Sequence, residues 1–511
     1  MLSKLQSFGL VGIEGLPVDV EIDLNNGLPS YDVVGLPDTS VKEGKDRIRS
    51  AIKNSGFEYP LYKITVNLAP ADTKKEGPIY DLPVALGLLS ATDQFPVDAT
   101  KGFVVLGELS LDGTIRKVNG ILPMLISARE HGFKKVIIPF DNQMEASYIE
   151  GMEIFALKSL AQTVRFLKGE EQILPVKVSS YEENIKKAVV PNDFCYIKGQ
   201  KTAKRALEIA AAGGHNMMMI GPPGSGKTML AKSFPSILPD MTFEEALEVT
   251  KVHSVVGTLD SKQGIVLTRP FRSPHHTTTT ISMVGGGRTS RPGEISLANN
   301  GVLFLDEMPE YPRNLLETLR QPLEDGVITV SRIAQSVEYP AHFTLLASMN
   351  PCPCGYYGSK IHECKCTLVQ IHNYLNKLSG PLMDRIDLQI EVDAIEYKDL
   401  KQDTKEETSA QVKERVAKAR EIQNERFKGT KIHNNSAMNS ALVKKYCKLS
   451  PECEKVLEQA FAKLNLTARA HDRILKVART IADLDGSENI ELSHLIEAIN
   501  YRSLDRKYWL W

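Results

Sequence analysis

Two short stretches near the start of the chain alternate apolar and polar residues and predict β-strands. Residues 18–24 place an apolar side chain at every second position, and residues 64–68 repeat this period. A period of two is typical of a strand with one buried face. Three helices and one more strand are predicted at residues 41–54, 81–90, 125–131 and 136–139. This mixture indicates an α+β domain, which we bound at residues 1–170.

The middle of the chain has a different pattern of apolar residues. Residues 171–193 are rich in charge, Ser and Pro, and we interpret them as a linker. After them come short apolar runs at 217–220, 302–305 and 343–347, bounded by Gly or polar residues. Runs of this kind between helical patterns are typical of buried parallel strands. We therefore expect an α/β core over residues 194–395.

The last part of the chain, residues 396–511, has few strand signals. Thr408 or Ser409 is a suitable cap for a helix. Residues 468–484 place apolar side chains on one stripe, and the Asp485-Gly486 pair then ends the pattern. We expect a helical bundle or lid.

A glycine-rich loop after the first of the core strands predicts a phosphate site. It reads Gly221-Pro222-Pro223-Gly224-Ser225-Gly226-Lys227-Thr228, between an apolar strand and a helix. This is a complete P-loop pattern in the context that it requires. Glycines let backbone N–H groups turn towards anionic oxygens, and a helix N-terminus adds partial positive charge. We expect ATP here, with Lys227 on the β- and γ-phosphates and Thr228 on Mg²⁺.

Polar side chains follow the next two strands of the predicted sheet. Asp306 and Glu307 come directly after the apolar run 302–305, and Asn350 follows the run 343–347. We expect Asp306 to hold Mg²⁺ and Glu307 to polarise the attacking water. Asn350 is suited to orienting that water without adding charge, although an Asn before Pro351 is also common in turns.

Composition narrows the class of protein but does not identify a partner. The chain has 511 residues, of which 62 are Lys or Arg and 63 are Asp or Glu, for a net charge of −1. This balance excludes a basic-tail nucleic-acid binder, although it cannot exclude a local basic surface. No apolar run reaches the ~18 residues of a membrane span, and the start lacks a secretory apolar region. With only seven cysteines, a disulfide framework is not indicated, and we expect a reducing cytoplasm.

Four of the cysteines form two close pairs, Cys352-x-Cys354 and Cys364-x-Cys366. Four thiolates can close a tetrahedral Zn²⁺ site. The usual spacing within a pair is two residues or more, so reduced thiols packed in a loop are the alternative. His362 is a further candidate ligand.

Longer motifs give the chain a family resemblance. It resembles the ComM/YifB family of magnesium-chelatase-like AAA+ ATPases over nearly its whole length. The runs that carry the resemblance, besides the P-loop, Asp306-Glu307 and Asn350, are Pro270-Phe-Arg-Ser-Pro-His-His276, Arg291-Pro-Gly-Glu-Ile-Ser-Leu-Ala298, Asn350-Pro-Cys-Pro-Cys-Gly355 and Ala478-Arg-Thr-Ile-Ala-Asp-Leu484.

The resemblance implies an ATP-driven homo-oligomeric ring, a hexamer. Within Gly380-Pro-Leu-Met-Asp-Arg385, Arg385 matches the arginine finger that reaches a neighbour's ATP. Arg469 matches the second sensor, supplied by the helical lid, and Arg473 is the fallback for this role. Arg332 lies in a predicted hairpin that faces the pore in related rings; a contact to nucleic acid and an ordinary exposed arginine are equally good interpretations.

The first domain resembles the Lon-type protease fold. The position aligned with that family's nucleophilic Ser is Ile79, and the position aligned with its catalytic Lys is Leu122. Neither apolar side chain can act as nucleophile or base, so protease activity is not expected. The domain is left to bind the substrate strand or a protein partner that the sequence does not identify.

The leading hypothesis is a DNA motor, a branch-migration helicase in recombination or uptake of foreign DNA. The DNA assignment depends on the resemblance, because the net charge does not favour it. The alternatives are a chelatase- or chaperone-like ATPase that remodels proteins, and an ATP-binding regulator with negligible turnover.

Overall fold

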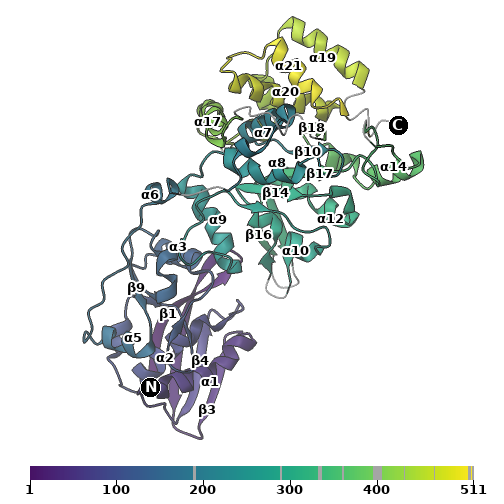
Figure 1. The fold of residues 1–511 in the computed structure, drawn as a ribbon. Coiled ribbons are helices and arrows are strands. Elements are labelled where there is room, and N and C mark those ends of the chain that lie inside the picture. The colour runs from purple at the N-terminus through teal and green to yellow at the C-terminus, as the bar shows by residue number, and fades with distance from the viewer. Residues whose placement is uncertain are drawn as a thin grey trace. The chain divides into compact units, whose positions relative to one another are not determined.

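The computed structural model describes residues 1–511 except 188–190, 288–289, 332–335, 360–361, 395–405, 431, 465–466, 505–507 and 509–511. The chain forms two compact units. The first contains Met1–Lys187 together with Thr242–Leu267, and the second contains Ala188–Met241 and Thr268–Trp511 (Figure 1). The segment Thr242–Leu267 thus belongs to the first unit although it lies within the 194–395 range. The 395/396 boundary that we set from the sequence falls outside the described residues.

The first unit is built on a seven-stranded mixed sheet in the order β3-β4-β2-β1-β5-β8-β9. Its strands are β1 (Leu2–Val11), β2 (Glu14–Asn25), β3 (Ser30–Val34), β4 (Lys63–Ala69), β5 (Phe103–Val105), β8 (Lys135–Pro139) and β9 (Glu153–Leu157). The strands predicted from the period of two are confirmed as β2 and β4, which pair antiparallel. Val18, Val20 and Ile22 are fully buried, so the alternation does mark one buried face.

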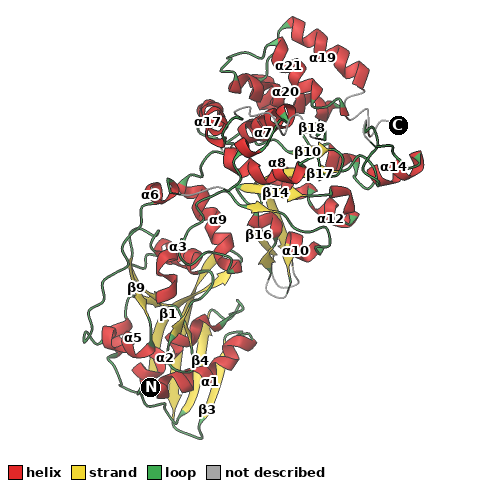
Figure 2. Ribbon diagram, viewed as in Figure 1, coloured by secondary structure: helices red, strands yellow, loops and turns green. Residues whose placement is uncertain are grey.

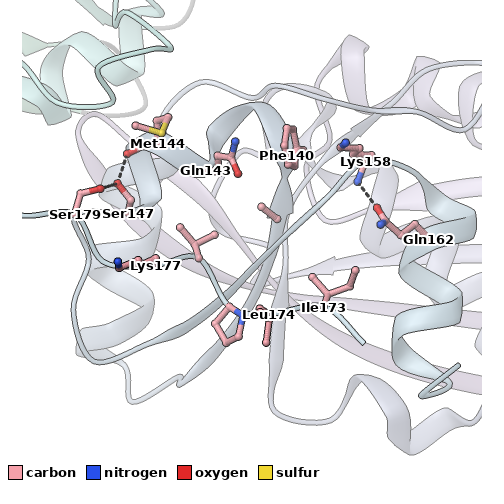
Figure 3. Close-up of a pocket in the computed structure, with 13 residues that line it drawn as sticks. Phe140, Gln143, Met144, Ser147, Lys158, Gln162, Ile173, Leu174, Lys177 and Ser179 are labelled. Carbon is pink, nitrogen blue, oxygen red and sulfur yellow. Dashed lines mark hydrogen bonds between the residues drawn. The ribbon is translucent and has the colours of Figure 1, made fainter. Parts of the chain in front are cut away.

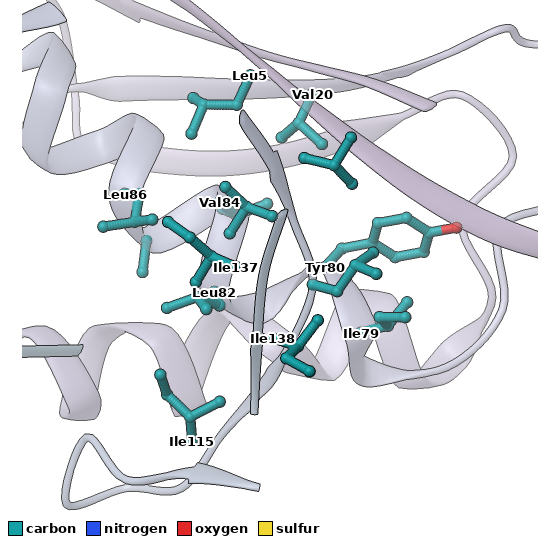
Figure 4. Packing of buried hydrophobic residues seen from close by; sticks show 14 of the residues in the cluster. Leu5, Val20, Ile79, Tyr80, Leu82, Val84, Leu86, Ile115, Ile137 and Ile138 are labelled. Carbon is teal, nitrogen blue, oxygen red and sulfur yellow. The ribbon is translucent and has the colours of Figure 1, made fainter. Parts of the chain in front are cut away.

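Helices of the first unit complete its hydrophobic core. They are α1 (Thr39–Asn54), α2 (Asp81–Ala91), α3 (Ile121–Glu130), α4 (Gln143–Ala146), α5 (Leu160–Leu167), α6 (Tyr181–Ile185) and α9 (Phe243–Val256). All residues of α2 are buried, and Figure 4 shows Leu82, Val84 and Leu86 packed in this core. The helix α9 is fixed to the unit by Ser254, whose hydroxyl donates to the buried carboxylate of Glu145.

The second unit contains a five-stranded sheet in the order β11-β14-β17-β10-β18. Its strands are β11 (Phe271–Arg272), β14 (Gly301–Leu305), β17 (Phe343–Met349), β10 (Met217–Ile220) and β18 (Leu388–Glu391). Every neighbouring pair is parallel, so the three apolar runs are confirmed as buried parallel strands. In a parallel sheet all carboxyl ends lie at one edge and all amino ends at the other.

The sheet of the second unit is accompanied by helices and by a hairpin (Figure 2). Helices of the sheet region are α7 (Lys201–Gly213), α8 (Lys227–Ser233), α10 (Thr280–Val284), α11 (Glu294–Leu297), α12 (Arg313–Thr318), α13 (Arg320–Asp325), α14 (Leu368–Leu375) and α15 (Gly380–Met383). The predicted hairpin is confirmed as β15 (Val327–Ser331) and β16 (Ser336–Pro340), which pair antiparallel. Arg332 lies outside the described residues.

The carboxyl-terminal part of the second unit is helical. It contains α17 (Ser409–Arg426), α18 (Ser440–Tyr446), α19 (Pro451–Leu464), α20 (Ala468–Leu484) and α21 (Leu492–Asn500). Thr408 caps α17, because its hydroxyl accepts the N–H of Gln411 and the Gln411 side chain accepts the Thr408 N–H. In the part of the chain that the structure describes, no helix has the length and apolar character needed to cross a bilayer.

Candidate nucleotide site

The predicted phosphate loop follows β10 at the carboxyl edge of the sheet. Gly224 and Gly226 adopt positive φ angles of 76° and 89°, which residues with a side chain rarely adopt. No heavy atom lies within 4 Å of the place where a Cβ would stand on either glycine. Gly221 is instead crowded, since a Cβ there would collide with the carbonyl of Val392. The space beside Gly224 and Gly226 is therefore open, whereas Gly221 packs closely against the segment after β18.

Lys227 begins α8 and is buried in this loop. Its Nζ donates to the carbonyl oxygens of Gly221 at 2.7 Å and Pro222 at 2.9 Å. The Asn350 Oδ1 atom is 3.4 Å away. Burial lowers the pKa of Lys227, and the charges of Asp306 and Glu307 oppose this shift. A partly desolvated ammonium held by neutral carbonyls is suited to binding phosphate oxygens, which would supply the missing negative charge.

The loop and the end of β14 meet at two side chains of predicted function. Thr228 Oγ1 donates to Asp306 Oδ2 at 2.8 Å. Ser348 of β17 donates its hydroxyl to the other oxygen of Asp306 and accepts the backbone N–H of Glu307 at 3.2 Å. The hydroxyl and carboxylate oxygens are ligands that Mg²⁺ prefers, so Thr228 and Asp306 fit the magnesium role expected of them.

Ser348 is a member of the site that the sequence did not reveal. It is fully buried and lies one residue beyond Ala347, which is the partner of Leu305 in the β14–β17 register. That register places Ser348 beside Asp306, where it holds the carboxylate. Its only sequence signal is its position two residues before Asn350, and this signal becomes informative once β14 and β17 are known to be neighbours.

Asn350 is brought into the site by the order of the strands. β17 lies between β14 and β10, so its carboxyl end lies between Asp306 on one side and the phosphate loop on the other. Glu307 has a left-handed backbone with φ 52°, a conformation that costs energy for a residue with a side chain. The carboxyl edge of the sheet thus holds five residues of the predicted site: Lys227, Thr228, Asp306, Glu307 and Asn350.

Arg385 lies at the opposite edge. Its carbonyl accepts a hydrogen bond from Asn216 Nδ2 at 3.0 Å, and Asn216 directly precedes β10, whereas the phosphate loop directly follows it. Its guanidinium donates to Pro381 O at 2.7 Å and pairs with Glu324 at the end of α13. The structure therefore does not bring Arg385 to the phosphate loop of its own chain.

The two arginines considered for the second sensor have different surroundings. Arg469 has a side chain that is 66% exposed, and its Nη1 lies 3.7 Å from Asp384 Oδ2. Arg473 is mostly buried, and its Nη1 donates to Asp387 Oδ1 at 2.8 Å. Burial would raise the pKa of Asp387, but Arg473 and His215 hold it well below its usual range. Arg473 is therefore part of a buried ion pair, whereas Arg469 is accessible.

The four paired cysteines converge in the loop after β17. The Sγ atoms of Cys352, Cys354, Cys364 and Cys366 all lie within 4.8 Å of one another, and the thiols are free. Burial would raise the pKa of Cys354, but N–H groups from Tyr356 and Lys365 hold it down to about 6. His362 does not join the cluster that the described residues form, and its ring packs 4.9 Å from that of Tyr356.

The positions that replace a protease dyad are both buried. Ile79 is 7% exposed and Leu122 is 1% exposed, and Figure 4 shows Ile79 in the core of the first unit. A separate pocket of this unit is lined by residues 173–177 together with Phe140, Lys158 and Gln162 (Figure 3). All residues that line it belong to the first unit.

Family models match three parts of the chain. Residues 193–400 match "Magnesium chelatase, subunit ChlI", residues 20–142 match "Subunit ChlI of Mg-chelatase", and residues 406–502 match "Magnesium chelatase, subunit ChlI C-terminal". The α/β fold with a parallel-sheet core fits the magnesium-chelatase-like class of AAA+ proteins.

Relatives define the family more closely. The chain is 45% identical to "Competence protein ComM" of Haemophilus influenzae over 513 residues, which cover 99% of this chain and 98% of the relative. It is also 45% identical to "Uncharacterized protein YifB" of Escherichia coli, with the same coverage. Over 124 residues, 24% of this chain and 22% of the relative, it is 31% identical to "Lon protease 2" of Bacillus subtilis. The chain belongs to the ComM/YifB family of magnesium-chelatase-like proteins.

Proposed function

We propose that the protein is an ATP hydrolase whose catalytic site begins at the carboxyl edge of the five-stranded sheet. The observation that carries this proposal is the contact of Thr228 with Asp306 at 2.8 Å, beside the buried Lys227. Lys227 would bind the β- and γ-phosphates, and Thr228 and Asp306 would hold Mg²⁺, which neutralises phosphate charge when bound. Glu307 would take a proton from water, and Asn350 would orient that water.

In this proposal the site is completed by a second copy of the chain. Arg385 and Arg469 both approach Asp384 or its neighbours at the amino edge, about one strand length from the phosphate loop. The four residues of β10 span roughly 10 Å, and Arg385, which pairs with Glu324 at the amino edge, does not reach the loop of its own chain. A ring of identical subunits would bring the amino edge of one copy to the phosphate loop of the next. We propose a hexamer, as the family resemblance implies.

We further propose that this ATPase moves DNA, as a branch-migration helicase in recombination or natural transformation. Support comes from the name of the Haemophilus relative, a competence protein, to which the chain is similar over nearly its full length. The first unit, which has apolar residues at the dyad positions, would bind the DNA strand or a protein partner. Proteolysis is not part of the proposal.

A second candidate is a chelatase- or chaperone-like ATPase that remodels a protein. It is favoured by the magnesium-chelatase subunit models, which match all three parts of the chain. The ATP site would be the same in both cases, and the two candidates differ in what stimulates turnover.

The experiment that separates them is the ATPase rate with and without forked and four-way DNA across a salt series. A DNA motor should be stimulated by DNA, and the stimulation should fall steeply as salt rises, because binding to phosphates releases counterions. Turnover that ignores DNA of every form, without strand displacement, would contradict the motor and favour the remodeller.

Replacement of Glu307 separates both candidates from a nucleotide-binding regulator. Glu307→Gln should keep ATP bound but lose hydrolysis by roughly 10²-fold or more, since the general base is removed. Equal turnover in Glu307→Gln and in the unmodified protein would show that the site binds ATP without hydrolysing it.

For the cysteine cluster we propose Zn²⁺ as the bound metal. Zn²⁺ is the commonest partner of four thiolates in a closed tetrahedral site. Metal analysis of the desalted protein tests this assignment directly.

A further inference from the structure

The cysteine loop is continuous with the residue that we assign to orient the attacking water. Asn350 directly follows β17, and only Pro351 separates it from Cys352. Cys352 is fully buried, and its sulfur accepts the backbone N–H of Tyr357 at 3.3 Å. Any group that fixes Cys352 therefore also fixes Asn350, two residues away.

The same loop rests on the phosphate loop. Gly355 has φ 87°, and a side-chain carbon built on it would stand 2.6 Å from Cδ of Pro223. The backbone at Gly355 thus lies against Pro223, and there is no space for a side chain between them. This contact ties the cysteine loop to the glycine-rich turn that would bind phosphate.

The second cysteine pair ties the loop to a helix. Cys366 precedes Thr367, which caps α14 through a capping box with Gln370. Tyr374 of this helix is 5% exposed. Burial raises the pKa of its hydroxyl, and the backbone of Asn350 lies close enough to oppose that shift. The four sulfurs therefore join the segment 350–355, which contains Asn350, to the segment 364–375, which contains Tyr374.

The spacing of the sulfurs suits a tetrahedral ion. A Zn–S bond of about 2.3 Å requires sulfurs about 3.8 Å apart in a regular tetrahedron. Three of the distances are 3.3 Å for Cys352–Cys354, 3.7 Å for Cys352–Cys364 and 3.6 Å for Cys354–Cys364.

We infer that an ion of the Zn²⁺ type, bound by these four thiolates, holds Asn350 and Pro223 in the arrangement that hydrolysis needs. The inference depends on the proposed ATPase, and it makes the metal centre a positioning element: hydrolysis depends on it much more than nucleotide binding does. The cysteines themselves do not contact the reacting atoms.

The first test compares Cys364→Ser with Cys195→Ser as a matched control, since Cys195 lies outside the cluster. We expect about one zinc per chain by plasma mass spectrometry in the unmodified protein and in the control, and loss of zinc in Cys364→Ser. Turnover in Cys364→Ser should fall about tenfold or more, while the dissociation constant for an ATP analogue changes less than about threefold. Desalted protein without stoichiometric zinc would overturn the inference.

The second test asks whether the metal acts through Asn350. In a double-mutant cycle, Cys364→Ser should cost little further turnover once Asn350 is replaced by Ala, because both changes remove the same function. Additive losses would contradict the positioning role. Where Cys364→Ser folds poorly, the unmodified protein is stripped with a mercurial and then given back ZnCl₂, and turnover should return with the metal.

A third readout does not use ATPase activity. Amide hydrogen exchange in 221–228 and 350–355 should rise when zinc is removed and fall when it is restored. If the protein shows this change but never hydrolyses ATP, the proposed function fails while the link between the metal and the phosphate loop stands. Unchanged exchange would refute the link itself.

Discussion

The two edges of the five-stranded sheet carry different halves of the proposed chemistry. At the carboxyl edge, Lys227, Thr228, Asp306 and Asn350 contact one another or the same neighbours within one chain. At the amino edge, Arg385 contacts Pro381 O and Glu324, and Arg469 lies beside Asp384, all in their own unit.

The carboxyl edge is the preorganised half of the proposed site. The carboxyl edge already has its side chains in mutual contact, so the nucleotide would meet a formed site. The amino edge holds Arg385 against Glu324, so the arginine would have to exchange this partner for a phosphate of another subunit. Variants that disturb one edge and leave the other intact should therefore separate the two halves.

The largest effect is expected at the carboxyl edge. Lys227→Ala should abolish both nucleotide binding and turnover, because the buried ammonium is the main positive charge in the loop. Binding of a fluorescent ATP analogue measures this. Lys232→Ala, an exposed lysine on the same helix, is the control and should bind normally; comparable loss in both variants would count against the assignment.

At the amino edge, Arg385→Ala should lower turnover by roughly 10³-fold and leave nucleotide binding nearly unchanged. The arginine would act only on charge that develops during hydrolysis in a neighbour. Steady-state ATPase and analogue binding together measure the split. Arg320→Ala removes a more exposed arginine, which pairs with Glu317, and serves as control. Loss of binding in Arg385→Ala would show that the two edges are not functionally separate.

Arg473 should differ from Arg469 in its effect on folding. Arg473→Ala leaves Asp387 buried without its main partner and should lower the free energy of unfolding by about 3 kcal/mol. Arg469→Ala removes an exposed pair and should cost about 0–1 kcal/mol. Because the pKa of Asp387 is depressed, this stabilisation is present at neutral pH and is lost as pH falls below the unfolded value near ~4. Chemical denaturation at pH 7 measures the difference, and equal costs would contradict it.

The smallest effect is expected from the partner that holds Arg385. Glu324→Gln removes the charge that pairs with Arg385 and should raise turnover about twofold, since the pair is exposed on the Glu324 side. The gain should shrink at high salt, which screens the pair in the unmodified protein. Glu317→Gln is the matched control. A fall in turnover would mean that Glu324 helps to position the arginine.

The residues of the carboxyl edge could be grouped from the sequence because the spacings that bring them together are local. A glycine-rich loop, an acidic pair after a strand and an Asn after another strand all depend on short spacings, and the parallel sheet brings them together. Ser348 was not predicted, because its role depends on which strands are neighbours in the sheet. Likewise, nothing local in Thr242–Leu267 indicates that this segment packs on the first unit, since tertiary burial of Ser254 against Glu145 decides it.

The sequence alone could not decide which arginine at the amino edge has which role. Arg469 and Arg473 are one helical turn apart on α20, and their types and spacing are equivalent. Burial separates them, because Arg473 faces Asp387 and Arg469 faces solvent. The hexameric ring and the DNA partner are inferred from the family, and both stay predictions.

The central claim is that one hydrolytic site needs both edges from different chains, and subunit mixing tests it most directly. Lys227→Ala and Arg385→Ala should each be inactive alone. When they are mixed in equal amounts and allowed to reassemble, about a quarter of the interfaces should join an intact loop to an intact arginine, and turnover should return to that level. A mixture that stays inactive although the two variants assemble together, or an Arg385→Ala protein that is fully active alone, would contradict the account.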